Sequence, residues 1–123
     1  MIIYVKALDL ADDITAMTFT GRLTLCNQLS DVEYAIRERI VQRLRKLILD
    51  FSGLNYIDSA GFGIIAVCVG LMERAGGRLA VVGAGGQVMQ LLALTHLDRV
   101  VEFYPNLASA RTALTDPASL PRA

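Results

Sequence analysis

The feature that most constrains this chain is residues 47–72, where a short apolar run is followed by a longer one. The first run has about the length of a buried strand, and the segment around residues 64–72 is long enough for a helix. Ser52-Gly53 lies between the two runs and predicts a turn. We therefore expect Ser59 where a strand and a loop lead into the N-terminus of a helix.

This position of Ser59 has two interpretations. Free backbone N–H groups and the positive end of a helix dipole favour an anion such as a phosphate. Serine is also a preferred N-cap residue, so Ser59 could simply cap the helix. Asp58 either orients the Ser59 hydroxyl or accepts hydrogen bonds from the turn. Gly61 and Gly63 form helices poorly, which indicates close approach by a partner or a neighbouring helix.

The remaining chain alternates strand and helix patterns. Residues 2–8 and 14–20 predict a hairpin around an acidic turn, and Gly21 is expected to end its second strand. Further strands are expected at 78–82 and 100–103, and helices at about 60–75, after the turn at 83–86, and from Asn106 or Ser109 to residue 114. The order β-β-α-β-α-β-α-β-α predicts an α/β fold: a mixed, mainly parallel sheet of about five strands with about four helices.

The first helix is expected after Ser30, because Ser30 and Glu33 have the spacing of a capping box. Apolar residues then recur at helical spacing, which predicts one face packed on the core. Arginines lie between them, at positions 37, 39, 43 and 45. Because acidic residues share that face and no aromatic residues interleave, a solvated surface is favoured over a nucleic-acid site.

Composition sets limits on the class of protein. With 123 residues we expect one domain over 1–115 and a flexible tail over 116–123. Twelve basic residues balance twelve acidic ones, so no overall field attracts nucleic acid. No apolar run is long enough to insert into a membrane. Cys26 and Cys68 lack metal-type spacing and predict buried thiols in a reducing cytoplasm.

The residues do not predict an enzyme. His96 is the only histidine and no nucleophile elbow is present, so a catalytic triad is not supported. Gly83-x-Gly85 begins like a dinucleotide fingerprint, but Val88 stands where the third glycine would be. Carboxylates are scattered over turns and helix faces. We expect no catalytic residue, no metal and no cofactor.

Laid out in this way, the chain resembles the STAS family, the fold of bacterial anti-sigma factor antagonists. The resemblance runs from about Ile14 to Leu114. Its most specific parts are Leu49-Asp50-Phe51-Ser52-Gly53-Leu54, Tyr56-Ile57-Asp58-Ser59-Ala60-Gly61-Phe62-Gly63 and Gly76-Gly77-Arg78-Leu79-Ala80-Val81-Val82-Gly83. The segment Leu92-Ala93-Leu94-Thr95-His96-Leu97-Asp98 matches a short helix end of the family.

The resemblance implies a partner switch. The unmodified protein would bind an anti-sigma factor of the histidine-kinase-like ATPase family and so release a sigma factor. That partner would also be a serine kinase acting on Ser59, and a phosphatase would reverse the modification. The implied binding surface comprises Arg22, Thr24, Asp58, Ser59, Ala60, Gly61 and Phe62.

The chain departs from the family pattern at two places. Family members of this type usually carry Gly-Glu-Leu-Asp where this chain has Gly21-Arg22-Leu23-Thr24, so one charge is reversed and another is lost. His96 stands where glycine is common, and we expect it to end a helix with positive φ instead of acting as a ligand. The departures leave open a second interpretation, a non-switching STAS scaffold or accessory subunit, as in stressosome-like or lipid-transport complexes.

Overall fold

The structure is a computed structural model, and it describes residues 3–23 and 28–115. These residues form five strands, four α-helices and one 3₁₀ turn. Their bounds are β1 Ile3–Ala11, β2 Ile14–Leu23, α1 Gln28–Gln42, β3 Lys46–Ile57, α2 Ser59–Arg74, β4 Arg78–Val82, α3 Gly86–Leu94, η1 Leu97–Arg99, β5 Glu102–Tyr104 and α4 Leu107–Thr115. The predicted order of elements is confirmed.

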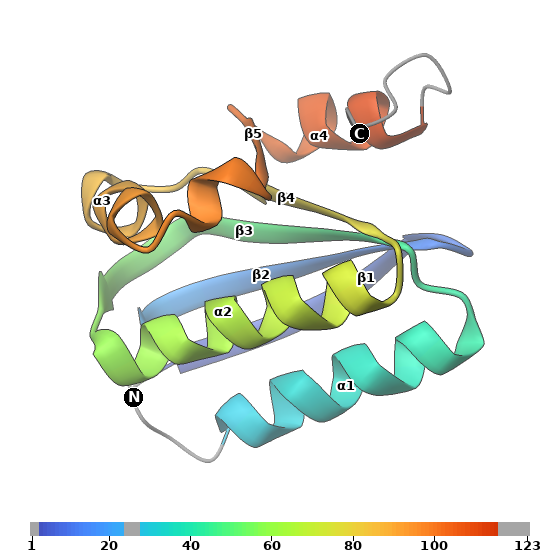
Figure 1. The fold of residues 1–123 in the computed structure, drawn as a ribbon, viewed down its shortest axis with the longest axis horizontal. Coiled ribbons are helices and arrows are strands. Elements are labelled where there is room, and N and C mark those ends of the chain that lie inside the picture. Colours follow the sequence, from blue (N-terminus) through green and yellow to red (C-terminus); the bar gives the residue numbers. More distant parts are fainter. Residues whose placement is uncertain (1–2, 24–27, 116–123) are drawn as a thin grey trace.

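The strands form one sheet in the order β1-β2-β3-β4-β5. β1 pairs antiparallel with β2, and the other neighbours pair in parallel. Figure 1 shows α1 and α2 side by side on one face of this sheet and α4 on the other. Because α2 follows the central strand β3, its N-terminus emerges at the carboxyl end of that strand, where α/β folds place their binding sites.

Alternate side chains of the strands enter two separate apolar clusters. Leu47, Leu49 and Phe51 of β3 face α1 and α2 and belong to the larger cluster. Ile48 faces α4 and belongs to the smaller one, together with Ala110 and Leu114 of that helix. The central strand is thus covered on both faces, which explains why its sequence is a continuous apolar run.

The predicted turn at Ser52-Gly53 is wrong, because β3 continues to Ile57. β2 also runs longer than expected, and its last residues pair with the second half of β3, from Thr20↔Gly53 to Leu23↔Ile57. The extra pairing supplies hydrogen bonds to a backbone that would otherwise leave the sheet. Tertiary pairing therefore overrides the local turn preference of the dipeptide.

The predicted capping box is also wrong. α1 begins at Gln28, which places Ser30 and Glu33 inside the helix. Glu33 instead accepts a hydrogen bond from Arg37 one turn later, with 2.9 Å between Oε2 and Nε. The spacing that predicted a cap is equally compatible with an ordinary i,i+4 ion pair on a helix surface.

Other boundaries differ by a few residues. β1 extends to Ala11, so the hairpin turn is confined to Asp12 and Asp13 instead of residues 9–13. Gly21 does not end β2, which continues to Leu23. β5 begins at Glu102 rather than at Val100. Of the two cap candidates for α4, Asn106 is the one used, since its Oδ1 accepts from the Ser109 amide at 2.8 Å.

The helix ends were predicted more accurately. Gly76 follows α2 with φ of 71°, and His96 lies beyond α3 with φ of 62°. Both are left-handed conformations that reverse the chain after a helix. His96 is exposed and makes no side-chain capping bond, so its backbone is what the helix end uses.

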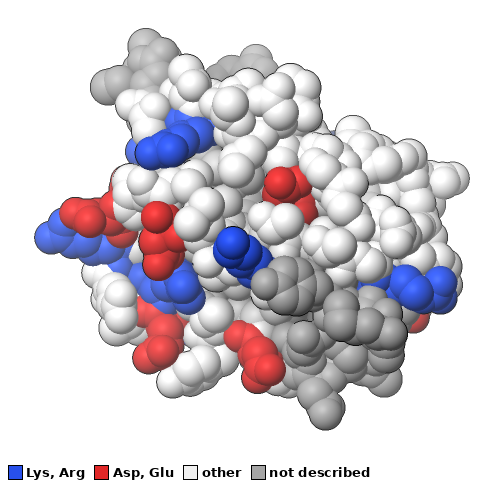
Figure 2. Space-filling view, turned by 180° about the vertical axis from the view of Figure 1, so that it is seen from behind, with Lys and Arg blue, Asp and Glu red and all other residues white. Residues whose placement is uncertain are grey.

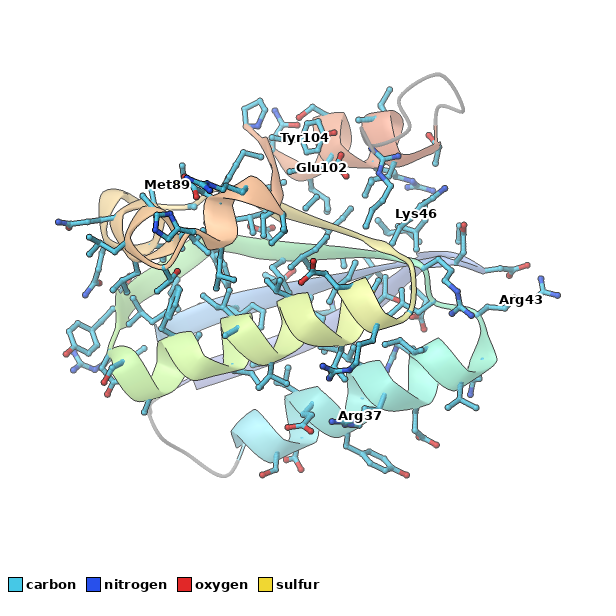
Figure 3. The ribbon with its side chains drawn as sticks, in the orientation of Figure 1. Arg37, Arg43, Lys46, Met89, Glu102 and Tyr104 are labelled. Carbon is cyan, nitrogen blue, oxygen red and sulfur yellow. The ribbon has the colours of Figure 1, made fainter. Side chains whose placement is uncertain are left out.

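β5 is tied to β4 by a partly buried ionic cluster. Arg78 of β4 donates two hydrogen bonds to Glu102, at 2.7 and 2.6 Å, and Tyr104 donates a third at 2.7 Å. Figure 3 shows Glu102 and Tyr104 together beside α4. Burial alone would raise the pKa of Glu102, but the hydrogen bonds from Arg78 and Tyr104 outweigh it and lower the pKa. The hydrogen bond to Glu102 raises the pKa of Arg78.

Among the described residues, no helix has both the length and the apolar character needed to cross a bilayer. Cys68 is buried as a free thiol in the larger cluster, and desolvation raises its pKa to about 12. Cys26 and the predicted tail at 116–123 lie outside the described residues.

Candidate site at the start of helix α2

The start of α2 is capped by Asp58 and not by Ser59. The Oδ1 atom of Asp58 accepts from the Gly61 amide at 2.8 Å, and its carbonyl accepts from the Phe62 amide at 2.8 Å. Ser59 is the first helical residue. The two open interpretations of Asp58 are thereby separated: it bonds the backbone of the turn, and its carboxylate does not hold the Ser59 hydroxyl.

The side chain of Ser59 is exposed and makes no hydrogen bond within residues 3–23 and 28–115. Ala60 beside it is also exposed. A serine that is neither buried nor used as a cap contributes little to the fold. Ser59 at the N-terminus of α2 is therefore accessible to a second molecule.

The end of β2 holds the start of α2 in place. The Leu23 carbonyl accepts from the Asp58 amide at 3.3 Å. It also lies directly against Gly61, where any Cβ would overlap the carbonyl oxygen. A close approach at Gly61 is therefore present, but it is made by a strand of the same chain and not by a neighbouring helix. Gly63 differs, because it is exposed and a Cβ at this position would meet nothing within 4 Å.

Arg22 and Tyr56 form the rim of the site beside α2. They are Cα partners across β2 and β3, one rung before Leu23 and Ile57. The guanidinium carbon of Arg22 lies 4.3 Å from the centre of the Tyr56 ring, in a cation–π contact. Gly21 has φ of 104° at an irregularity in the strand pairing, a bulge that sets the direction of the following side chain.

The expected surface residues thus fall into three groups. Arg22, Ser59 and Ala60 are exposed and Asp58 is half-buried. Gly61 and Phe62 are buried, the latter with 8% of its surface exposed, so they shape the site from beneath. Thr24 lies outside the described residues. Tyr56 was not anticipated, because only the strand register reveals that it lies under Arg22.

The glycine-rich turn before α3 has a structural role. Gly83 has φ of 66° and packs against Ser52 of β3. The side chain of Gln87 then bonds both the amide and the carbonyl of Ile57, at 3.3 and 2.8 Å. A groove of about 220 Å³ lies between the end of β3 and the start of α3, and its described lining residues include no lysine or arginine.

Most paired charges lie at the opposite end of the domain. Arg39, Arg43 and Lys46 pair with the acidic residues 9, 12 and 13 around the β1–β2 turn. Figure 3 shows Arg43 and Lys46 at this end, far from the start of α2. In Figure 2 blue and red atoms lie side by side on the left, with no broad patch of one sign. In the described part of the chain, no cluster of three or more histidine, cysteine or acidic side chains is arranged for a metal.

Comparison with known proteins gives a consistent result. The STAS domain family profile matches residues 6–110. The Anti-sigma F factor antagonist of Paenibacillus polymyxa is 28% identical over 92 residues, which is 73% of this chain and 79% of the relative.

Solved structures show the same architecture. An anti-sigma factor antagonist from Mycobacterium paratuberculosis has a TM-score of 0.72 at 25% identity, with 93% of this chain and 95% of that one covered. The Bacillus cell fate determinant SpoIIAA in its phosphorylated form has a TM-score of 0.75 at 14% identity, covering 89% and 98%, and shows the fold alone. This chain belongs to the STAS domain family.

Proposed function

We propose that this protein is an anti-sigma factor antagonist that is switched by phosphorylation of Ser59. The observation that carries the proposal is the exposed Ser59 hydroxyl at the start of α2, with the capping role already taken by Asp58. The relative from Paenibacillus polymyxa is named for this activity, which supports the assignment. The unmodified protein would bind a histidine-kinase-like anti-sigma factor in the cytoplasm and so release a sigma factor.

The energetics suit a switch at this position. A phosphate adds about −1.5 to −2 charges at pH 7. The helix dipole would favour that charge by only about 0.3–1 kcal/mol. Like charges brought together at an interface cost several kcal/mol, which approaches the roughly 5.5 kcal/mol needed to invert a two-state population. Modification of Ser59 would therefore release a partner without unfolding the domain.

In this proposal the chain is a ligand and a kinase substrate, and it has no catalytic role. The anti-sigma factor would transfer the phosphoryl group from ATP to Ser59, and a phosphatase would hydrolyse it. The exposed surface that a kinase would meet comprises Arg22, Ser59 and Ala60, with Asp58 half-buried between them. Gly63, one turn further along α2, has open space above it and would let the partner approach the helix closely.

The test is intact mass after incubation with ATP and a histidine-kinase-like ATPase from the same organism. We expect the addition of one phosphate, lost in Ser59→Ala and retained in Ser30→Ala, which removes another exposed serine. A phosphate that persists in Ser59→Ala would refute the site. ATP turnover by the purified chain alone would refute the non-enzymatic role.

The second candidate is a non-switching STAS scaffold or accessory subunit. The observation that favours it is Arg22, a cation at the rim of the site where family members of the switching type usually carry an acid. A stable complex with the ATPase and no modification of Ser59 would support this alternative over the switch.

A further inference from the structure

We propose that the groove between α1 and α2 is a second docking surface, and that its occupant is an acidic amphipathic helix of a partner protein. The groove has a volume of about 270 Å³, and its lining residues are Arg37, Ile40, Val41, Leu71, Arg74 and Ala75. It lies at the carboxyl-terminal end of α2, whereas Ser59 is the first residue of that helix. The inference goes beyond the proposed function, because this surface does not include the phosphorylation site.

The floor of the groove is apolar. Leu71 of α2 is 5% exposed, and Ile40 of α1 and Ala75 at the end of α2 are half-buried. Figure 1 shows α1 and α2 side by side, and a seam between two helices is a surface on which a third helix packs its apolar face. Pockets for small molecules usually measure about 300–1,000 Å³. The size of this groove therefore suits single side chains of a protein better than a cofactor.

The outer face of α1 carries apolar side chains where a solvated helix would be polar. Val41 is 87% exposed, the largest exposed fraction among the large hydrophobic residues of the described chain. Tyr34, two turns earlier on α1, is 64% exposed. Tyr34, Arg37 and Val41 have the i, i+3, i+7 spacing of one helix face, so this stripe continues the groove along α1. A partner that covered the stripe would remove its apolar surface from water.

The charges that border the groove have one sign, because both charged lining residues are arginines. Glu33 accepts from the Nε atom of Arg37 at 2.9 Å, and the terminal nitrogens of this guanidinium have no acceptor among the described residues. The guanidinium of Arg74 has no acceptor in residues 3–23 and 28–115 either. It lies back over Gly70, where a Cβ would be 3.4 Å from its Nη1. Both groups therefore have donors for the carboxylates of a partner.

Shape and charge together define the occupant. An apolar side chain of the partner would pack on Ile40 and Leu71, while acidic side chains beside it would reach Arg37 and Arg74. A basic segment would be repelled by both arginines. Since α2 has 16 residues, its two ends are about 24 Å apart. A partner bound in the groove would thus leave Ser59 accessible and would stay bound when phosphorylation releases the other partner.

The experiment uses the full chain and a synthetic peptide as the probe. The peptide has about 18 residues, enough for a helix of roughly 27 Å, with leucines at i, i+3, i+4 and i+7 spacing and glutamates beside them. A second peptide carries glutamine in place of each glutamate. Fluorescence anisotropy of the labelled peptide measures Kd, and ¹H–¹⁵N chemical shifts of the chain locate the site. We expect shifts around Val41 and Leu71, and binding of the neutral peptide that is weaker by about fivefold to tenfold.

Val41→Glu and Arg74→Glu test the groove, and each should weaken binding of the acidic peptide by about tenfold or more. Arg99→Glu is the matched control, because Arg99 is an exposed arginine of η1 outside the groove, and its Kd should be unchanged. A peptide with lysine in place of glutamate should bind the double variant Arg37→Glu/Arg74→Glu more tightly than the unsubstituted chain. That gain separates a charge contact from a loss of folding, which far-UV circular dichroism checks as well.

Four results would overturn the inference. One is absence of binding by the acidic peptide at about 1 mM. Another is equal weakening by Arg99→Glu, because binding would then depend only on overall charge. A dimer that Val41→Glu dissociates would assign the groove to a second copy of the chain, and preferred binding of anionic vesicles would assign it to a membrane. Because phosphorylation of Ser59 is measured separately by intact mass, each proposal fails without the other.

Discussion

Gly61 of α2 lies directly against the backbone carbonyl of Leu23, so closely that a Cβ at position 61 would overlap the carbonyl oxygen. The contact joins the end of β2 to the first turn of α2. Because the obstructing atom belongs to a paired strand, it cannot rotate aside as a flexible side chain could. The position of Ser59 relative to the sheet therefore depends on glycine at position 61, because any larger residue would push α2 away from β2.

Gly61→Ala should destabilise the domain despite the better helix propensity of alanine. We expect a loss of about 2–3 kcal/mol in the free energy of unfolding from this overpacking. Gly63→Ala is the control, since open space surrounds that position, and it should gain up to about 1 kcal/mol. Urea denaturation followed by circular dichroism measures both, and equal effects would contradict the contact.

Asp58→Ala and Ser59→Ala should separate the cap from the phosphorylation site. Loss of the Asp58 carboxylate leaves the Gly61 amide without its acceptor and should cost about 1 kcal/mol. Ser59→Ala should change the free energy of unfolding by less than about 0.5 kcal/mol, as for other exposed positions. Chemical denaturation of the two variants tests this, and a larger loss for Ser59→Ala would mean that the serine has a structural role.

Glu102→Gln should weaken the attachment of β5 by leaving the Arg78 guanidinium, 8% exposed, without its anion. Loss of one partner from a buried pair costs roughly 3–5 kcal/mol. We expect about 2 kcal/mol here, because the Glu102 side chain is 25% exposed. Glu33→Gln breaks the exposed pair with Arg37 and should cost under about 0.5 kcal/mol. Urea midpoints of the two variants at pH 7 decide the comparison.

The same residue contributes to acid sensitivity. The pKa of Glu102 is lower in the folded protein than its ordinary value of 4.5, so the unfolded state binds more protons as the pH falls through 4.5. Stability from Glu102 is present above this range and is lost below it. Glu102→Gln should therefore lose less stability between about pH 6 and pH 3, the range over which glutamate titrates. The hydrogen bond from Arg39 lowers the pKa of Asp9 as well. The free energy of unfolding of Glu102→Gln should therefore still depend on pH, but less steeply.

His96→Gly should stabilise the domain. His96 has φ of 62°, a conformation that costs a non-glycine residue roughly 1–2 kcal/mol. Part of the gain is offset because glycine has more freedom in the unfolded chain, so we expect about 0.5–1 kcal/mol. Thr95→Gly is the control, since Thr95 has φ of −96° and bonds the end of α3 through its hydroxyl. Thermal denaturation should show opposite shifts for the two variants.

Cys68 should be unreactive in the folded protein. Its thiol is buried and has a pKa of about 12, so the nucleophilic thiolate is scarce at pH 8. In a Cys26→Ser background, labelling by a thiol reagent should follow global unfolding and accelerate with urea. Rapid labelling in native buffer would show that the larger apolar cluster opens locally around α2.

Patterns within single segments predicted much of this architecture. The apolar runs at 47–51 and 78–82 were identified as strands, and both lie in the sheet. The helix expected at about 60–75 is observed as Ser59–Arg74. These predictions depend on periodicity and on residues such as Gly76, which act through the backbone next to them. Local patterns of this kind predict correctly where tertiary packing favours the same secondary structure.

One prediction failed because a distant segment decided the outcome. The Ser52-Gly53 turn was overridden because β2 pairs with β3 on both sides of it, and a single segment does not contain its pairing partners. The Ser30 cap failed within its own segment: α1 begins two residues earlier, and Glu33 pairs with Arg37 inside the helix.

By itself, the amino-acid sequence determined the order of strands and helices and placed Ser59 at the start of a helix, because apolar periodicity and turn residues are local properties. Only the tertiary structure decided that Asp58 is the cap, that Gly61 rests on Leu23 and that Arg22 lies on Tyr56. The contacts of Gly61 with Leu23 and of Arg22 with Tyr56 join residues whose separation along the chain carries no pattern. They arise from the register of the parallel strands β2 and β3 and from the direction in which the chain leaves β3 to begin α2. The Asp58 cap is local, and it was settled only when the structure showed at which residue the helix begins.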